Sequence, residues 1–417
     1  MTSPDEKRLS LKVVSPPRKS AQGGAAPSGV VLSEPMRRFR CNQKGCCCSG
    51  WDIPFRLEDF LRLHEHLPPA ERVELTRGIK LVVDAKEKGA NGETILHSLK
   101  LDGVGEGDAC RFLEPAGACR VHAQSGVEAL PDLCVDFPAF SFHRKDAAIE
   151  MWFDPVCPEV LAQLDESDAP LSLHRQEGLF EEPMMDLRVS HASETIIGRI
   201  GKQVIEIASL DSIRAESIAQ LGRSDRPAWH TLAVLLDAIA RLSPGADGQC
   251  ALELDHAVET GPFLRFFWAC IGAHGTDLLA ASFVKYQRFI YAIDAQPIVA
   301  RAGDLERHLA QWEPAFEAWL APQDELLAPL FSRYLAHRFG TPMVKGKAEL
   351  RCAADEIVQI FATAQRFAAA MGAVLEQPVD RRMFQVALGA SEFFFRSLHL
   401  PRAALPWFAS REPEVVW

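Results

Sequence analysis

The sequence predicts an α+β protein in which a small cysteine-rich unit of mixed α/β structure is followed by a mostly α-helical unit. Two observations predict this division. Eight of the eleven cysteines lie between residues 41 and 157, where short strand patterns and helix patterns alternate. From about residue 190 onward, apolar residues recur at the spacing of amphipathic helices. The 417 residues and the apolar content of 47% suffice for two or three folded units with a substantial core.

We expect the chain to divide into three regions. Residues 1–33 are rich in Pro, Ser, Gly and Ala and poor in large apolar side chains, which predicts a disordered tail. Residues 34–165 form a cysteine-cluster metal-binding domain, and residues 175–417 form a helical domain. The polar stretch at 165–170 has the composition of a linker between them. The first 40 residues carry eight basic and three acidic side chains, which we interpret as a solvated basic arm.

Short elements are predicted within the cysteine-rich region. Alternating apolar residues predict strands, and Gly with Asn at 88–92 predicts the turn between the first two of them. The expected elements are a helix over 57–66, strands over 79–83, 94–101 and 147–153, and a helix over 158–164.

The remainder of the chain has helical periodicity. Ile196, Ile200, Val204 and Ala208 lie four residues apart, which predicts a helix. Further helices are predicted to begin near residue 227, to pass through 278–290 and 350–371, and to end before Pro401. No fixed-period repeat is present, so the pattern does not indicate a solenoid.

Charge and hydropathy exclude several classes of partner. The net charge is −11 and the sequence pI is about 5.7, so we expect no sequence-independent binding of nucleic acid. The N-terminus lacks the apolar region of a secretory signal, and the most apolar run, 263–271, is short and contains Arg265. We therefore expect no membrane association and a cytoplasmic location, where thiols stay reduced and clustered cysteines indicate metal binding.

The clustered cysteines are the strongest functional signal. Thiolates are preferred ligands of zinc and of iron–sulfur clusters, so we expect a metal centre built from these side chains. The candidate ligands are Cys41, Cys46, Cys47, Cys48, Cys110, Cys119, Cys134 and Cys157. No C-x-x-C pair or ferredoxin spacing is present, so zinc and iron–sulfur both remain open. The isolated Cys250, Cys270 and Cys352 are expected to be small buried apolar residues.

The local sequence around each cysteine suggests how the ligands converge. Gly45 permits a sharp turn before Cys46–Cys48, although three consecutive side chains diverge too much to bind one metal together. Cys110 and Cys119 flank a predicted strand–turn–strand with Pro115 and Gly117 in its turn. Cys134 precedes Phe137-Pro138, and Cys157 precedes Pro158 at a predicted helix start.

Other residues near the cysteines have two interpretations each. The glycines at 103–107 follow a predicted strand, but no helix pattern follows them, which favours a turn over a nucleotide-binding loop. Two histidines of the region could replace a missing thiolate, or could be ordinary hydrogen-bonded side chains. Three aspartates are expected to support ligands or turns, and two tryptophans to be core aromatics. These residues are His122, His143, Asp52, Asp136, Asp154, Trp51 and Trp152.

Several of these motifs together resemble a known family. The run Cys41-x-x-Lys44-Gly45-x-Cys47-Cys48 resembles the C-x-x-C-G-x-C-C signature of the YkgJ-type cysteine-cluster domain, with Lys44 in place of the second cysteine. The flagellin lysine-N-methylase (FliB) branch is similar in its further motifs. These are Ser49-Gly-Trp-Asp-Ile53, Cys110-Arg-Phe-Leu113, Cys119-Arg-Val121, Gly126 to Cys134 with Phe137-Pro138, and Cys157-Pro-Glu159.

The resemblance implies a cysteine-bound iron–sulfur cluster or zinc ion and methyl transfer from S-adenosylmethionine to a lysine of a protein substrate, which the sequence does not identify. That reaction requires an in-line donor, a deprotonated amine and a base, and the sequence assigns no residue to the base. The alternative is a non-catalytic protein, in which the metal cross-links and stabilises the cysteine-rich region and the helical region binds a partner.

Overall fold

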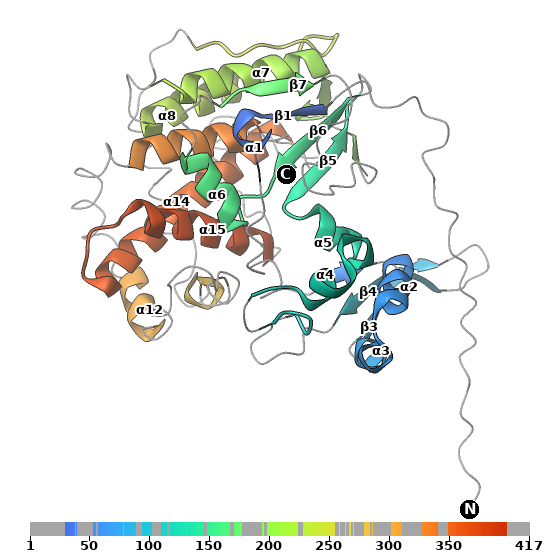
Figure 1. The fold of residues 1–417 in the computed structure, drawn as a ribbon. Coiled ribbons are helices and arrows are strands. Elements are labelled where there is room, and N and C mark those ends of the chain that lie inside the picture. Colours follow the sequence, from blue (N-terminus) through green and yellow to red (C-terminus); the bar gives the residue numbers. More distant parts are fainter. Residues whose placement is uncertain are drawn as a thin grey trace, which may run out of the picture.

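The computed structural model describes 30–37, 39, 53–55, 57–77, 79–88, 94–101, 110–114, 117–144, 148–166, 171–176, 194–195, 198–223, 228–254, 258, 263, 267, 270, 279–283, 286, 302–310, 327–340 and 349–397. Most of these residues are helical, and they also form three separate sheets (Figure 1). The predicted α+β class is therefore confirmed.

The largest sheet has five strands in the order β7-β1-β6-β5-β8. Its strands are β1 (Val30–Ser33), β5 (Ala139–His143), β6 (Ile149–Phe153), β7 (Leu173–Gln176) and β8 (Glu194–Thr195). All five residues of β6 are buried. Because successive side chains of a strand point to opposite faces, this burial means that both faces of the sheet are covered at β6. The strand predicted over 147–153 is confirmed.

Strand β1 was not expected. Residues 30–33 end the segment predicted to be disordered, yet Val30 lies opposite Ile149 in parallel β6 and opposite Gln176 in antiparallel β7. The prediction is wrong for these four residues. A short run of β-branched and apolar side chains gains its stability from partners that are distant in sequence, which local composition does not reveal.

A smaller unit follows β1 in the chain and packs around a core of its own. Its helical elements are α2 (Leu57–His66), α3 (Pro69–Arg77), α4 (Arg120–Ser125), η2 (Val127–Ala129) and α5 (Asp132–Asp136), and its sheet, in the order β2-β4-β3, contains β2 (Ile53–Phe55), β3 (Ile79–Lys88) and β4 (Thr94–Leu101). The bounds of α2 and the antiparallel pairing of β3 with β4 confirm the predictions for these segments. The core of this unit, hereafter the small apolar cluster, consists of Leu63, Leu67, Leu75, Phe112, Val121, Ala129, Leu130 and Val135.

The helical region packs against the five-stranded sheet. Its elements are α6 (Pro158–Glu166), α7 (Ile207–Leu221), α8 (Ala228–Arg241), α12 (Ala302–Ala310), α14 (Leu350–Leu375), α15 (Arg381–Ser397) and the helix over 327–340. Side chains cap the two longest helices, since Glu349 accepts from the Cys352 N–H at 3.1 Å and Asp380 accepts from the Met383 N–H at 2.7 Å. The helices predicted near 227, over 350–371 and before Pro401 are confirmed.

The apolar packing does not break at the predicted domain boundary. Val160, Leu161 and Leu164 of α6 belong to the same buried cluster as Phe384 and Phe393 of α15. The sheet and α6 therefore share one core with the helical region, while the small apolar cluster is separate from it.

The helix predicted through 196–208 is wrong. Strands β9 (Gly198–Ile200) and β10 (Gln203–Ile205) form a hairpin there, and α7 begins only at residue 207. Gly201 in the hairpin turn has φ of +58°, a left-handed conformation that a helix does not accommodate and that glycine adopts at little cost.

Helix α14 has the length and composition of a membrane-spanning helix. However, 89% of its most apolar 18-residue window is buried inside the protein. Its apolar surface is thus covered by other parts of the chain, as in the core helix of a folded domain.

Gly389 provides a test of this packing. A Cβ added at Gly389 in α15 would overlap the Tyr286 hydroxyl, and the Tyr286 side chain is fully buried and cannot move aside. Gly389→Ala should lower the free energy of unfolding by about 1–3 kcal/mol, measured by denaturant unfolding, because overpacking strains a dense core. Gly222→Ala is the matched comparison, since a Cβ at Gly222 makes only ordinary contacts of 3.4 Å or more at a φ of −76°. Equal stability of the two variants would contradict the packing at α15.

Candidate metal centre

Three of the predicted ligands lie against the small apolar cluster. Cys110, Cys119 and Cys134 are all half-buried, and all three pack against its side chains. They come from three different places in the fold: the start of a tight hairpin, the start of α4 and the middle of α5. The fold therefore gathers thiols that are as many as 24 residues apart in the sequence around one small core.

In the described residues between Cys110 and Cys119, the predicted strand–turn–strand is reduced to a hairpin closed by one isolated β-bridge. The Leu113 N–H donates to the Cys110 carbonyl at 2.9 Å, and Leu113 forms a β-bridge with Cys119. Gly117 in the turn has φ of +88°. After Cys119 the chain enters α4, where the Cys119 carbonyl accepts from the Ala123 N–H at 3.0 Å. The backbone around both thiols is thus fixed by hydrogen bonds within a few residues.

Polar contacts join α2 and α3 to the segments that carry the thiols. Arg62 of α2 donates to the Leu130 carbonyl at 2.9 Å and pairs with the buried Asp59 at 2.5 Å. Arg120, the residue after Cys119, pairs with Glu71 of α3 at 3.5 Å. These contacts tie α4 and the loop that precedes Cys134 to the rest of the small unit.

Cys157 lies in the main core rather than the small apolar cluster. Its side chain is buried, and its carbonyl accepts from the Val160 N–H at 3.1 Å, which confirms a position at the start of α6. The turn before Cys157 nevertheless adjoins the segment that follows Cys134. The Asp154 N–H donates to the Pro138 carbonyl at 2.8 Å, and Phe153 pairs with Ala139 at the same end of the sheet.

The other four predicted ligands lie outside the described residues; they are Cys41, Cys46, Cys47 and Cys48. The same holds for Trp51, Asp52 and the glycines at 103–107. Within the part of the chain that the structure describes, no three His, Cys, Asp or Glu side chains converge closely enough to hold a metal. Cys110, Cys119 and Cys134, as the structure places them, therefore do not form a metal site by themselves.

The residues with two interpretations now have defined surroundings. Asp154 is a turn residue, because its carboxylate accepts from the Val156 N–H at 3.0 Å. Trp152 is a core aromatic, as expected. His122 lies in α4, and His143 lies at the far end of β5 from Pro138, opposite Ile149. Of the isolated cysteines, Cys270 is fully buried, whereas Cys250 and Cys352 are partly exposed.

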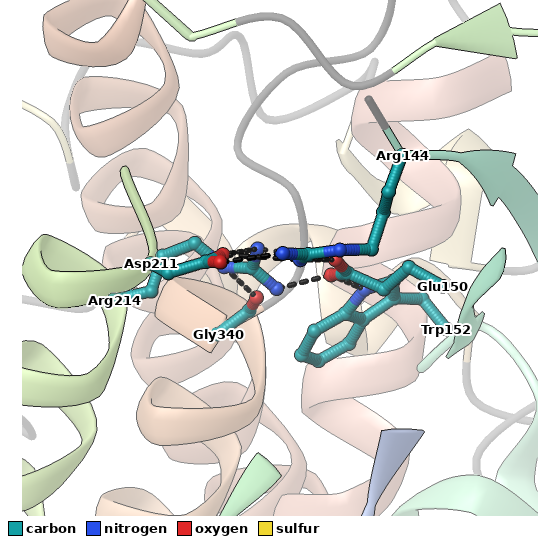
Figure 2. Close-up of polar contacts among 6 residues, drawn as sticks. All are labelled: Arg144, Glu150, Trp152, Asp211, Arg214 and Gly340. Atoms are coloured by element: carbon teal, nitrogen blue, oxygen red, sulfur yellow. Dashed lines mark hydrogen bonds and ion pairs between the residues drawn. The ribbon is translucent and has the colours of Figure 1, made fainter. Parts of the chain in front are cut away.

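A buried ionic ring, which the sequence did not predict, joins the sheet to the helical region. Arg144 and Arg214 each contact both Glu150 and Asp211, so the four charges alternate around a closed ring (Figure 2). Arg144 lies 2.8 Å from Glu150 and 2.5 Å from Asp211. The Trp152 indole N–H donates to Glu150 at 2.5 Å. Asp211 is the most exposed of the four side chains, at 37%, and the other three are buried.

The ionic ring connects three structural elements. Glu150 lies on β6, Asp211 and Arg214 lie on α7, and Arg214 also donates to the Gly340 carbonyl at 2.7 Å at the end of the 327–340 helix. Its two positive and two negative charges cancel. We interpret the ring as a structural connection, because a balanced set of buried charges leaves none to attract a ligand.

A second buried polar group lies beside the turn of Cys157. The His337 Nε2 atom is 2.7 Å from the Phe153 carbonyl, and its ring is 5.5 Å from that of Trp152. Burial lowers the pKa of His337 to about 4, so the imidazole is neutral at physiological pH and donates its single N–H to the carbonyl. Nearby, Glu392 accepts from the Tyr334 hydroxyl at 2.7 Å and pairs with Arg338 at 3.1 Å.

Comparison with protein families, with curated proteins and with solved structures found no match to this chain.

Proposed function

We propose that this chain binds an iron–sulfur cluster or zinc through the cysteines of its first third and transfers a methyl group from S-adenosylmethionine to a lysine of a protein substrate. The observation that carries the metal proposal is the grouping of Cys110, Cys119 and Cys134 around the small apolar cluster. The turn before Cys157 contacts the segment that follows Cys134 through the hydrogen bond from the Asp154 N–H to the Pro138 carbonyl. The methyl transfer rests on the resemblance of the ordered cysteine motifs to the FliB branch.

The residues around these thiols suit a soft metal. Thiolate sulfur is the donor that zinc and iron–sulfur centres prefer, and partial burial limits access of water to the bound group. We propose that one or two of Cys110, Cys119, Cys134 and Cys157 share the ligation with members of Cys41 and Cys46–Cys48. When bound, the metal would connect segments of the small unit in addition to its small apolar cluster, as structural metals do in small domains.

Methyl transfer requires a defined sequence of bond changes. The lone pair of a neutral lysine amine attacks the methyl carbon of the sulfonium donor, the carbon–sulfur bond breaks, and S-adenosylhomocysteine leaves as a neutral thioether. The amine must lose a proton to a base or to water, and positioning of the two reactants supplies much of the rate.

The metal proposal is tested by Cys134→Ser. We expect the anaerobically purified variant to lose most of its iron or zinc, measured by elemental analysis, because a missing ligand opens a structural site. The matched variant is Cys250→Ser, which changes a partly exposed cysteine that packs against the main core and should retain the metal of the native protein. Native protein that contains neither metal would reject the proposal.

The catalytic proposal is tested on the metal-loaded full chain. Calorimetric titration with S-adenosylmethionine and with S-adenosylhomocysteine should show saturable binding of both. If the metal is present but neither compound binds, the second candidate function applies. In that case the metal only stabilises the cysteine-rich region, and the helical region binds a partner protein.

A further inference from the structure

The small unit is inserted into the chain of the main body, which comprises the five-stranded sheet and the helical region. The chain leaves the main body at Phe39, whose ring lies 4.9 Å from that of Phe153 and belongs to the main core. It returns at Ala139, which pairs with the same Phe153 across β5 and β6. Both ends of the insertion therefore lie beside one residue of the sheet. Close ends allow an inserted segment to fold as a unit of its own without distorting its host.

The described elements of the small unit pack on one another. Helix α2 packs on β4 and η2, α4 packs on η2, and α5 packs on β2. The Ser125 hydroxyl at the end of α4 donates to the His66 carbonyl at the end of α2 at 3.2 Å, in addition to the contacts of Arg62 and Arg120. Figure 1 shows α2, α3, α4 and α5 grouped together, apart from α7, α8 and α14. The unit thus has the internal packing of a separate folding unit.

Separate cores predict separate stabilities. The small apolar cluster contains eight side chains and is distinct from the much larger main core. Burial of apolar surface is the dominant stabilising contribution to folding, so a small core opposes unfolding less than a large one does. Contiguous units with contacts of their own commonly open at a lower free energy than the whole protein. We therefore expect the small unit to open first.

We infer that the small unit opens and refolds as one cooperative unit while the main body stays folded, and that this opening controls access to Cys110, Cys119 and Cys134. All three thiols pack against the small apolar cluster, so its opening exposes them together. Cys157 and Cys270 are buried in the main core and stay covered during that opening. The insertion is a conformational device that exposes one group of cysteines without unfolding the rest of the protein.

Two leucine variants of the full chain test this inference. Leu75→Ala removes a fully buried side chain from the small apolar cluster, and Leu388→Ala removes a fully buried side chain from the main core in α15. Amide hydrogen exchange followed by mass spectrometry measures the opening of each segment. Timed alkylation, with the modified peptides identified by mass spectrometry, measures access to each cysteine.

We expect Leu75→Ala to accelerate exchange in α2, α4 and α5 by about 30-fold or more, because truncation of a buried leucine strongly destabilises the unit that contains it. Alkylation of the three thiols around the small apolar cluster should accelerate by a similar factor. Exchange in β6 and α14 should stay at the rate of the native protein. Leu388→Ala, in contrast, should accelerate exchange in β6 and α14.

Acceleration of exchange in β6 and α14 by Leu75→Ala would overturn the inference, because it would show that the two cores unfold as one. Faster exchange in the small unit with unchanged alkylation would show that the thiols are reached without opening, and would overturn the control of access. If Leu75→Ala yields no soluble protein, the smaller truncation Val121→Ala in the same cluster is measured instead. Its expected acceleration is about tenfold, confined to the same segments.

Discussion

Replacement of Glu150 by glutamine should lower the free energy of unfolding by about 3–5 kcal/mol, the usual loss when one partner of a buried ion pair is removed. Glu150 is fully buried between Arg144 and Arg214. Arginine cannot release its proton at accessible pH, so the variant would retain two buried guanidinium groups with Asp211 as their remaining carboxylate within the ionic ring. The Asp211 side chain is partly exposed, so it compensates the two guanidinium charges less completely than the buried Glu150 does.

Glu216→Gln provides the matched comparison for Glu150→Gln. Glu216 is an exposed residue on α7 whose carboxylate accepts from Gln220 at 2.8 Å, and a surface change of this kind is worth at most about 0.5 kcal/mol. Urea unfolding followed by far-ultraviolet circular dichroism measures both variants. A loss below about 1 kcal/mol for Glu150→Gln would show that the ionic ring does not connect the sheet to α7 as described.

Asp355→Asn should reverse the order of stability of variant and native protein between acidic and alkaline pH. Asp355 on α14 is 4% exposed. Burial, with a smaller contribution from Glu349, raises its pKa from 3.8 to about 8. The folded protein therefore keeps this proton over a range in which the unfolded chain has released it, and stability is lost as pH rises toward 8. Each pKa unit corresponds to about 1.4 kcal/mol, so the loss between pH 5 and pH 8 is about 4 kcal/mol.

The asparagine variant lacks this titration, so its stability should exceed that of the native protein at pH 8 and not at pH 5. His337 contributes in the opposite sense, because its lowered pKa means that stability is lost as pH falls from about 6.5 to about 4. Since both proteins contain His337, the difference between them isolates Asp355. Denaturant unfolding at pH 5, 6.5 and 8 provides the comparison, and curves that stay parallel would show that Asp355 is ionised in the fold.

The sequence predicted those parts of the fold that local patterns determine. The helix at 57–66 and the long helix from residue 350 follow from amphipathic spacing, and Cys157 begins a helix because Pro158 suits the first helical position. The hairpin at 198–205 was missed for a physical reason. A four-residue spacing places Ile200 and Val204 on one face of a helix and equally on one face of a strand, so the pattern did not decide between them.

The metal centre stays a prediction, and the structure describes only the surroundings of some candidate ligands. Spacing and turn residues predicted the hairpin between Cys110 and Cys119. Spacing alone did not separate Cys157, which packs in the main core, from the three thiols around the small apolar cluster.

The ionic ring could not be predicted, because its four members are individually ordinary surface residue types: Arg144, Glu150, Asp211 and Arg214. Only the tertiary packing of α7 against β6 brings them together.

The place of β1 in the sheet has a consequence for biosynthesis. Residues 30–33 leave the ribosome long before their partners at 149 and 173–176 have been translated. At about 5–20 residues per second, this strand waits on the order of ten seconds with no neighbour from its own sheet. During that interval its apolar side chains are available to chaperones and to other nascent chains, so the yield of native protein should depend on translation speed.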